Sequence, residues 1–283
     1  MKYFLTSIFL LSFFLSVTAQ KTLVPKGKLF IIGGGDRPPS LMKELVTTAN
    51  FSAKDYVVVL PMSSEEPDTS FFYLKEDLQP VCQNSIVEFN FTKENVNNKA
   101  WLDSLENARL IFITGGDQDR FMKIVFNTPV FDAIHKAYAK GATISGTSAG
   151  AAVMSQHMIT GAELTDTTYR ATFKKVHQNN IVIKEGLGLI TSAVIDQHFI
   201  IRSRYNRLLS AIAEYPTLTC IGIDETTAII VSGNKVEVTG DGQVVVFKNP
   251  KELKIADHDL IKFKDLRLSI YTKGDTFFLI QSH

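Results

Sequence analysis

The sequence predicts an α/β fold with a mostly parallel sheet, helices on both faces of that sheet, and antiparallel strands toward the C-terminus. Short apolar runs without polar alternation recur in the first half of the chain and end in glycine, proline or aspartate. Such runs are typical of parallel strands that are buried on both faces. Segments with helical periodicity separate the runs, and this alternation predicts helices that cover both sides of one sheet.

The elements of this half follow a strand–helix order from residue 28 to residue 144. Ligand crevices form at the carboxyl ends of parallel strands, and glycine and aspartate cluster there, as in Gly33-Gly34-Gly35. The predicted strands are 28–32, 56–60, 85–89, 109–113 and 142–144, and the predicted helices are 40–51, 70–78, 99–107, 121–126 and 128–140.

After about Thr227 the chain consists of β-rich pieces separated by turn signals such as Gly240-Asp241-Gly242. We expect antiparallel strands that extend the same sheet or form a small flank. Because no linker, internal repeat or low-complexity stretch interrupts the chain, we predict a single domain over residues 20–283. The strands predicted here are 229–231, 235–238, 243–247 and 266–271.

The composition excludes several classes of protein. Of 283 residues, 45% are hydrophobic, which provides enough apolar material for a core and excludes a disordered chain. Lys and Arg number 30 against 29 Asp and Glu. No stretch carries a concentrated basic block, so we expect neither nucleic acid nor an anionic membrane surface as a partner.

Residues 1–19 predict a secretory signal peptide. Lys2 precedes an apolar run over 4–17, and Val17-Thr18-Ala19 supplies the small residues of a cleavage site. We therefore expect an exported protein, periplasmic or extracellular, that begins at Gln20. An uncleaved membrane anchor is the alternative, and no later stretch is long and apolar enough to span a bilayer.

The two cysteines, Cys82 and Cys220, form no disulfide framework signature. Cys220 lies in an apolar run over 218–223, where we expect a buried strand and a free thiol. No Cys and His residues have metal-ligand spacing. We therefore expect no metal and no other cofactor.

A G-x-S-x-G motif spans Gly146 to Gly150, between a predicted strand and the apolar segment 151–154. A serine at a tight strand-to-helix turn exposes its hydroxyl, and flanking glycines relieve the crowding of such a turn. The free N–H groups of the following helix can stabilise a developing oxyanion. The motif predicts Ser148 as a nucleophile, with a small-residue packing turn as the alternative.

A serine hydroxyl needs a neighbouring base to react at neutral pH. Among the six histidines, His198 lies where the apolar run 192–197 meets an arginine-rich segment, and it is the candidate base. We place His157 at the end of the helix after the motif, too far along to turn back. We expect His135 on the surface of its helix.

A carboxylate best orients the imidazole and stabilises its charged form. Asp224 and Glu225 both follow the predicted strand over 218–223. Because side chains alternate, one of the two points away from any shared cleft. The residues alone leave the choice open, and two solvated strand-end acids are the alternative.

Arg202, Arg204 and Arg207 follow His198 and would radiate around the start of a helix. Guanidinium groups pair with carboxylates in a bidentate manner, which suggests a substrate that carries carboxylates. Asp196 could instead receive a cationic substrate group. A solvated helix face is the ordinary alternative.

The run from Thr114 to Gln118 ends an earlier strand, and its glycines allow close backbone approach. We expect this turn to supply a second oxyanion donor, beside the N–H of Ala149. An ordinary glycine-rich turn is the alternative.

Four blocks of the sequence together resemble the cyanophycinases of peptidase family S51, which also includes the aspartyl dipeptidase peptidase E. They are Gly115 to Gln118, Gly146 to Ala151, Asp196 to Phe199 with the three arginines, and Gly222 to Glu225. The resemblance covers nearly the whole mature chain. It implies a three-layer, flavodoxin-like fold similar to class I glutamine amidotransferases, with serine in place of their cysteine.

The resemblance also implies residue roles. Ser148 matches the family's nucleophile, His198 its base, and Glu225 its acid in preference to Asp224. The order serine, histidine, acid differs from that of α/β-hydrolases, in which the acid precedes the histidine. The implied substrate pocket consists of Gln118, Asp196, Gln197, Arg202, Arg204 and Arg207.

The implied activity is that of a metal-free homodimer that degrades a polymer of aspartate, with arginine on each β-carboxyl, to β-Asp-Arg dipeptides. We expect Ser148 to attack a β-linked aspartyl carbonyl while the N–H groups of Gly116 and Ala149 hold the oxyanion. An aspartyl or isoaspartyl dipeptidase of the same family is one alternative. A catalytically silent binding protein with this fold is another.

Overall fold

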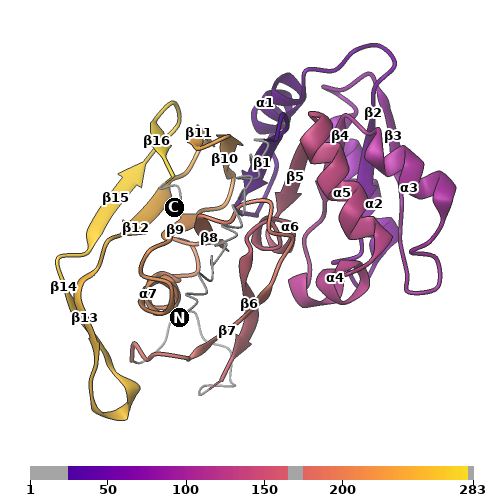
Figure 1. Cartoon of the computed structure of the whole chain (residues 1–283). Helices are drawn as coiled ribbons and strands as arrows, with labels where there is room; N and C mark the ends of the chain where they lie inside the picture. The colour runs from indigo at the N-terminus through magenta and orange to yellow at the C-terminus, as the bar shows by residue number, and fades with distance from the viewer. Residues whose placement is uncertain (1–24, 165–174, 280–283) are drawn as a thin grey trace, which may run out of the picture.

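A computed structural model describes residues 25–164 and 175–279 of the chain, and the predicted signal peptide over 1–19 lies outside these residues (Figure 1). Its centre is an eight-stranded sheet. In sheet order the strands are β16 (Thr276–Phe278), β11 (Lys235–Gly240), β10 (Thr227–Ser232), β1 (Lys28–Ile32), β5 (Thr143–Thr147), β4 (Leu110–Ile113), β2 (Tyr56–Leu60) and β3 (Ser85–Glu88).

The half of this sheet from β1 to β3 is parallel, as predicted, whereas β10, β11 and β16 continue it in antiparallel fashion. Parallel pairing places the carboxyl ends of β1, β4 and β5 at one edge of the sheet, which is where crevices form in such folds. The glycine-rich turns after these strands therefore lie close together.

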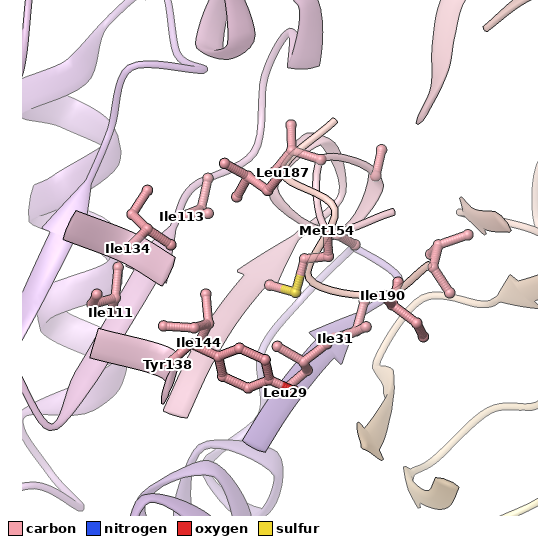
Figure 2. Packing of buried hydrophobic residues seen from close by; sticks show 14 of the residues in the cluster. Leu29, Ile31, Ile111, Ile113, Ile134, Tyr138, Ile144, Met154, Leu187 and Ile190 are labelled. Carbon is pink, nitrogen blue, oxygen red and sulfur yellow. The ribbon is translucent and has the colours of Figure 1, made fainter. Parts of the chain in front are cut away.

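Helices cover both faces of the parallel half, which confirms the predicted layers. Alternate residues of β1 point to opposite faces: Phe30 and Ile32 join one buried cluster, and Leu29 and Ile31 join the other. The first cluster is covered by α1 (Pro39–Ala49) and α2 (Pro67–Leu78). Figure 2 shows Leu29 and Ile31 in the second. That cluster is covered by α3 (Lys99–Glu106), α4 (Gln118–Val125) and α5 (Pro129–Lys140).

A second, four-stranded sheet lies beside the first (Figure 1). Its strands in order are β15 (Arg267–Tyr271), β12 (Val244–Lys248), β9 (Thr219–Ile223) and β8 (Ala193–Gln197), and α7 (Tyr205–Glu214) contacts β9 and β12. Ile195 and Ile221 of this sheet belong to the same buried cluster as Leu29, so the apolar core is continuous between the sheets. The C-terminal strands were expected either to extend the main sheet or to form a flank, and they divide between the two: β10, β11 and β16 extend the main sheet, whereas β12 and β15 lie in the smaller one.

Several elements were not predicted. The antiparallel pair β6 (His157–Glu163) and β7 (Ile181–Glu185) follows α6 (Ala149–Ala152), which is only one turn long. His157 therefore opens a strand, and its placement at the end of a helix was wrong. The second hairpin consists of β13 (Lys251–Ile255) and β14 (Ile261–Lys264), with a 3-10 turn at Asp257–Asp259 between them. None of the helices in the described ranges has the length and hydropathy that a membrane crossing requires.

Candidate active site

Ser148 occupies a sharp turn between β5 and α6. Its backbone angles, φ 53° and ψ −110°, lie in a region that costs of order 1–3 kcal/mol for a residue with a side chain. The turn closes only because its neighbours are glycines. A β-carbon on Gly146 would lie 2.3 Å from the carbonyl oxygen of Gly150, and one on Gly150 would lie 2.2 Å from that of Ile113. The motif therefore forms the tight strand-to-helix turn that the sequence predicts.

His198 joins Ser148 to Glu225 through two hydrogen bonds. Its Nε2 lies 2.8 Å from the hydroxyl oxygen of Ser148, and its Nδ1 lies 2.5 Å from Oε1 of Glu225. Because a carboxylate can only accept, Nδ1 carries the proton and donates it to Glu225, which leaves Nε2 to accept from the serine hydroxyl. The structure thus brings the serine, imidazole and carboxylate into one chain in the order the resemblance implies.

The side chains of Asp224 and Glu225 point in different directions, as strand alternation predicts. Oδ1 of Asp224 accepts the N–H groups of Ile200 and Ile201, at 3.0 and 3.1 Å. Asp224 therefore holds the turn that follows His198, while Glu225 contacts the imidazole itself. Both acids lie in the short connection that carries the chain from β9 in the small sheet to β10 in the large one.

A glycine floor supports the imidazole and the carboxylate. A β-carbon on Gly34 would lie 2.3 Å from Cε1 of His198, and one on Gly35 would lie 2.7 Å from Cβ of Glu225. The N–H of His198 also donates to the carbonyl of Gly33, at 2.8 Å. The sequence analysis placed these glycines at the crevice end of a strand but gave them no contact with the predicted base or acid. Three consecutive glycines at the crevice edge of a parallel sheet were the signal that other side chains of the site pack directly against this backbone.

Burial lowers the pKa of His198 below its ordinary value of 6.5. Only 7% of the residue is exposed, so the charged imidazolium is poorly solvated. The hydrogen bond to Glu225 partly offsets this by raising the pKa, and the nearby charge of Arg202 lowers it further. His198 is consequently neutral at neutral pH and free to accept a proton.

Two backbone segments next to Ser148 offer N–H donors. Within 25–164 and 175–279, the N–H groups of Ala149 and Gly116 donate to no acceptor. A β-carbon on Gly115 would lie 3.5 Å from Cβ of Ser148, so this glycine turn runs beside the serine. Gly115 lines the cleft that contains Ser148, whereas Gly116 lines the neighbouring one.

The cleft beside Ser148 has a volume of about 290 Å³. Ser148 and His198 lie in its wall, together with Arg37 from the segment after β1 and Tyr73 from α2. Sequence analysis missed both Arg37 and Tyr73 as site residues. Arg37 could have been found, because it closely follows the glycines at the crevice end of β1, but nothing in the sequence brings α2 to this edge.

Four of the residues expected to line the substrate pocket are instead buried together between β8 and α7. Asp196 is fully buried, and Gln197, Arg204 and Arg207 are each less than 9% exposed. Oδ1 of Asp196 accepts from Arg204 at 3.3 Å and from Arg207 at 3.1 Å, and Arg204 also donates to the side chain and carbonyl of Gln197. Both guanidinium groups pair with this internal carboxylate, while Oδ2 of Asp196 and Nε of Arg207 have no hydrogen-bond partner among the described residues, so a pocket-lining role for these four stays a prediction.

The other two expected pocket residues are placed differently. Arg202 is half-buried in the turn before α7. Gln118 begins α4, and its Nε2 donates to the carbonyl of Ile159 at 2.9 Å. It lines a second cleft of about 460 Å³, which Asp119 and Lys184 share. Neither residue lines the cleft beside Ser148.

His135 and the two cysteines lie away from the cleft beside Ser148 and do not line it. Nε2 of His135 lies 2.7 Å from the carbonyl of Leu187, so this histidine is half-buried and the expected surface position was wrong. Cys82 and Cys220 are both buried and free, which confirms the expectation for Cys220. In the part of the chain that the structure describes, no group of three or more His, Cys, Asp or Glu side chains is placed to hold a metal ion.

Comparison with known families and proteins gives a consistent result. A family model described as peptidase family S51 matches residues 29–239. The cyanophycinase of Trichormus variabilis is 33% identical over 241 residues, which cover 81% of this chain and 77% of that protein. The cyanophycinase of Geminocystis herdmanii is 36% identical over 189 residues, or 64% of this chain and 66% of that protein.

Solved structures share the fold at lower sequence identity. A peptidase from an acI-B1 Actinobacterium superposes with a TM-score of 0.65 at 21% identity, covering 91% of this chain and 98% of that one. A protein from Listeria monocytogenes EGD-e described as a peptidase E superposes with a TM-score of 0.53 at 18% identity, covering 76% of this chain and 99% of that one. These likenesses support the α/β fold with a large mixed sheet flanked by helices.

Proposed function

The chain belongs to peptidase family S51, and from this premise we propose that it is a serine-type exopeptidase that releases β-Asp-Arg dipeptides from an aspartate–arginine polymer. The hydrogen-bonded chain from Ser148 through His198 to Glu225 is the observation that carries the proposal. Identity of 33% to a cyanophycinase over 81% of the chain supports the choice of substrate.

In the proposed mechanism, neutral His198 takes the proton of Ser148 as the serine oxygen bonds to the substrate carbonyl carbon. Glu225 holds the imidazole in the required tautomer and stabilises the imidazolium that forms. The N–H groups of Gly116 and Ala149 would hold the developing oxyanion, and one such donor typically contributes about 3 kcal/mol. His198 then protonates the departing amine, and a water molecule hydrolyses the ester on Ser148.

The bond that breaks follows from the product. A β-Asp-Arg dipeptide keeps the amide between the β-carboxyl of aspartate and arginine. Attack on that β-linked carbonyl, as expected from the sequence, would instead release free arginine. We therefore correct that expectation: the serine attacks the main-chain carbonyl between consecutive aspartates, and a terminal residue leaves as the dipeptide through its α-amino group.

A dipeptidase that acts on aspartyl or isoaspartyl peptides is the second candidate. The cleft beside Ser148, with a volume of about 290 Å³, has room for part of such a peptide. A catalytically silent binding protein is disfavoured, since such a protein has no need to keep a buried imidazole between a hydroxyl and a carboxylate.

The test is to incubate a chain beginning at Gln20 with the insoluble polymer and, separately, with aspartyl and isoaspartyl dipeptides, and to identify the products by mass. Release of β-Asp-Arg supports the polymer; cleavage of dipeptides alone selects the second candidate. The Ser148→Ala variant, folded as judged by its melting temperature, should do neither. Labelling of Ser148 by a fluorophosphonate in the parent protein, and its absence in this variant, separates an enzyme from a silent protein.

We also propose that the protein is exported, as residues 1–19 predict, and that it acts as a homodimer, as the family resemblance implies. Sequencing the N-terminus of the protein recovered from its native cells should find Gln20 first. Light scattering of the purified protein should give twice the mass of one chain. Retention of residues 1–19 or a monomeric mass would contradict these two points without touching the proposed chemistry.

A further inference from the structure

Arg37 supplies the permanent charge of the cleft beside Ser148. Among the described residues that line this cleft, Arg37 is the only lysine or arginine, and none is an aspartate or glutamate. His198 is neutral there because burial lowers its pKa. With about 20% of its side chain exposed, Arg37 is mostly packed yet still open to the cleft. Arg37 lines the cleft whereas its partner Asp77 does not, so the guanidinium N–H donors that remain there favour a ligand group of negative charge.

Asp77 of α2 fixes the orientation of this guanidinium. Oδ2 of Asp77 accepts from Nε of Arg37 at 2.8 Å and lies 2.6 Å from Nη2. Asp77 lies on the same face of α2 as Ser70 and Leu74, which line the cleft, since these residues are three, four or seven positions apart. One helix face thus forms a wall of the cleft and also holds the arginine against it.

This arrangement leaves one edge of the guanidinium available. A guanidinium has five N–H donors in a planar fork and can serve carboxylates on two edges. Asp77 occupies the edge formed by Nε and Nη2, and Nη1 has no hydrogen-bond partner in the described part of the chain. Because the group is already oriented, binding an anion on the free edge sacrifices little side-chain entropy.

We infer that Arg37 determines specificity by pairing with a substrate carboxylate in the cleft that contains Ser148. This inference rests on the proposed function and refines it. Arg204 and Arg207, which the sequence suggested for this role, are paired with Asp196 instead. Both candidate substrates carry a suitable group: each polymer repeat ends in the carboxylate of its arginine, and an aspartyl dipeptide has the side-chain carboxylate.

The test measures how well β-Asp-Arg, and the same dipeptide with its carboxyl groups amidated, protect Ser148 from a fluorophosphonate. The parent protein should be protected by the acid at concentrations at least tenfold lower than by the amide. In Arg37→Gln this preference should fall to about one, and in Arg37→Lys it should be partly retained. Arg267→Gln, which removes an exposed arginine from β15, is the matched control and should behave like the parent.

The rate of labelling without any dipeptide shows whether each variant keeps its site assembled. Should Arg37→Gln fail to fold, Arg37→Lys provides the second variant, because it keeps the charge without the planar fork and should retain only part of the preference for the acid. A preference that survives in Arg37→Gln, or is missing in the parent, overturns the inference and leaves the proposed function standing. Failure of Ser148 to react in the parent would instead overturn the proposed function itself.

Discussion

The imidazole of His198 lies directly against the backbone of Gly34, whose absent β-carbon would come within 2.3 Å of Cε1. Gly34 also has φ 122°, which side-chain-bearing residues rarely adopt. We predict that Gly34→Ala displaces the imidazole and lowers kcat by at least tenfold. Peptidase assays measure the loss of activity, and thermal denaturation shows whether the variant also loses stability.

The matched control for this variant is Gly141→Ala. Gly141 has φ 120°, close to that of Gly34, but the nearest atom to its would-be β-carbon is 3.8 Å away, an ordinary contact. It should therefore reproduce the backbone strain without the clash, and activity should be retained. Equal activity losses in the two variants would show that backbone strain, and not contact with His198, explains the effect.

Replacing Glu225 tests the carboxylate that contacts Nδ1 of His198. Glu225→Gln keeps the shape but no longer enforces the tautomer that leaves Nε2 free to accept. We expect kcat to fall by roughly two to four orders of magnitude, as is typical when such a group is neutralised. Asp224→Asn is the control, because its side chain can still accept from Ile200 and Ile201. If the Asp224 variant lost activity and the Glu225 variant kept it, the two acids would have been assigned in reverse.

The pH dependence of activity should report the buried imidazole. Because burial lowers the pKa of His198, the acid limb of the kcat/KM profile should have its midpoint below pH 6.5. Arg202→Gln removes a positive charge that lowers this pKa, so the limb should shift to higher pH, whereas Arg202→Lys should leave it in place. An unshifted limb in Arg202→Gln would mean that another group controls the profile.

The same shift affects stability. Between the lowered pKa and 6.5, the unfolded chain binds a proton that the folded protein does not, so the free energy of unfolding should decrease as the pH falls below 6.5. This effect should begin near pH 6.5 and level off at the lowered pKa of the folded protein, around which the activity is lost. Urea titrations at a series of pH values measure it.

Asp196 should prove structural. It is fully buried and pairs with Arg204 and Arg207, so Asp196→Asn removes the carboxylate that these two buried cations share and should lower the free energy of unfolding by about 3–5 kcal/mol. Asp119→Asn, which breaks the partly exposed pair with Lys184, should cost less than about 1 kcal/mol. Urea denaturation of both variants checks this. A raised KM with unchanged stability in Asp196→Asn would instead support contact with a substrate guanidinium.

The layers of the fold follow from local sequence, because buried parallel strands and their covering helices have strong periodic signals. β1 and β2 were predicted with the bounds observed. Strands β6, β7, β13 and β14 were not predicted, since their pairing depends on partners that no local pattern reveals. The helix after Ser148 was predicted to reach His157, but it is one turn long and ends at Ala152. The apolar residues after it pack in the core without being helical, so their hydrophobicity did not mark where the helix ends.

The site residues likewise divide into those that local sequence predicts and those that depend on tertiary packing. Ser148 was identified from a motif whose geometry is local, and the alternation of Asp224 and Glu225 was foreseen, although the residues did not say which acid faces His198. The arginines could not be assigned from sequence, because whether a guanidinium meets a substrate or an internal carboxylate depends on how β8 packs against α7. The pairing of Arg37 with Asp77 also could not be predicted, because the two residues are 40 positions apart in the sequence and meet only through the packing of α2.

Ser148 is anchored to the large sheet, whereas His198 directly follows a strand of the small one, and the two sheets meet through a shared apolar core and hydrogen bonds such as that from His198 N–H to Gly33. The reactive pair consequently exists only while the two sheets stay docked. Heating that loosens the contact between the two sheets should abolish peptidase activity at a temperature at which the circular dichroism spectrum is still that of the folded protein. Loss of activity would then precede loss of secondary structure.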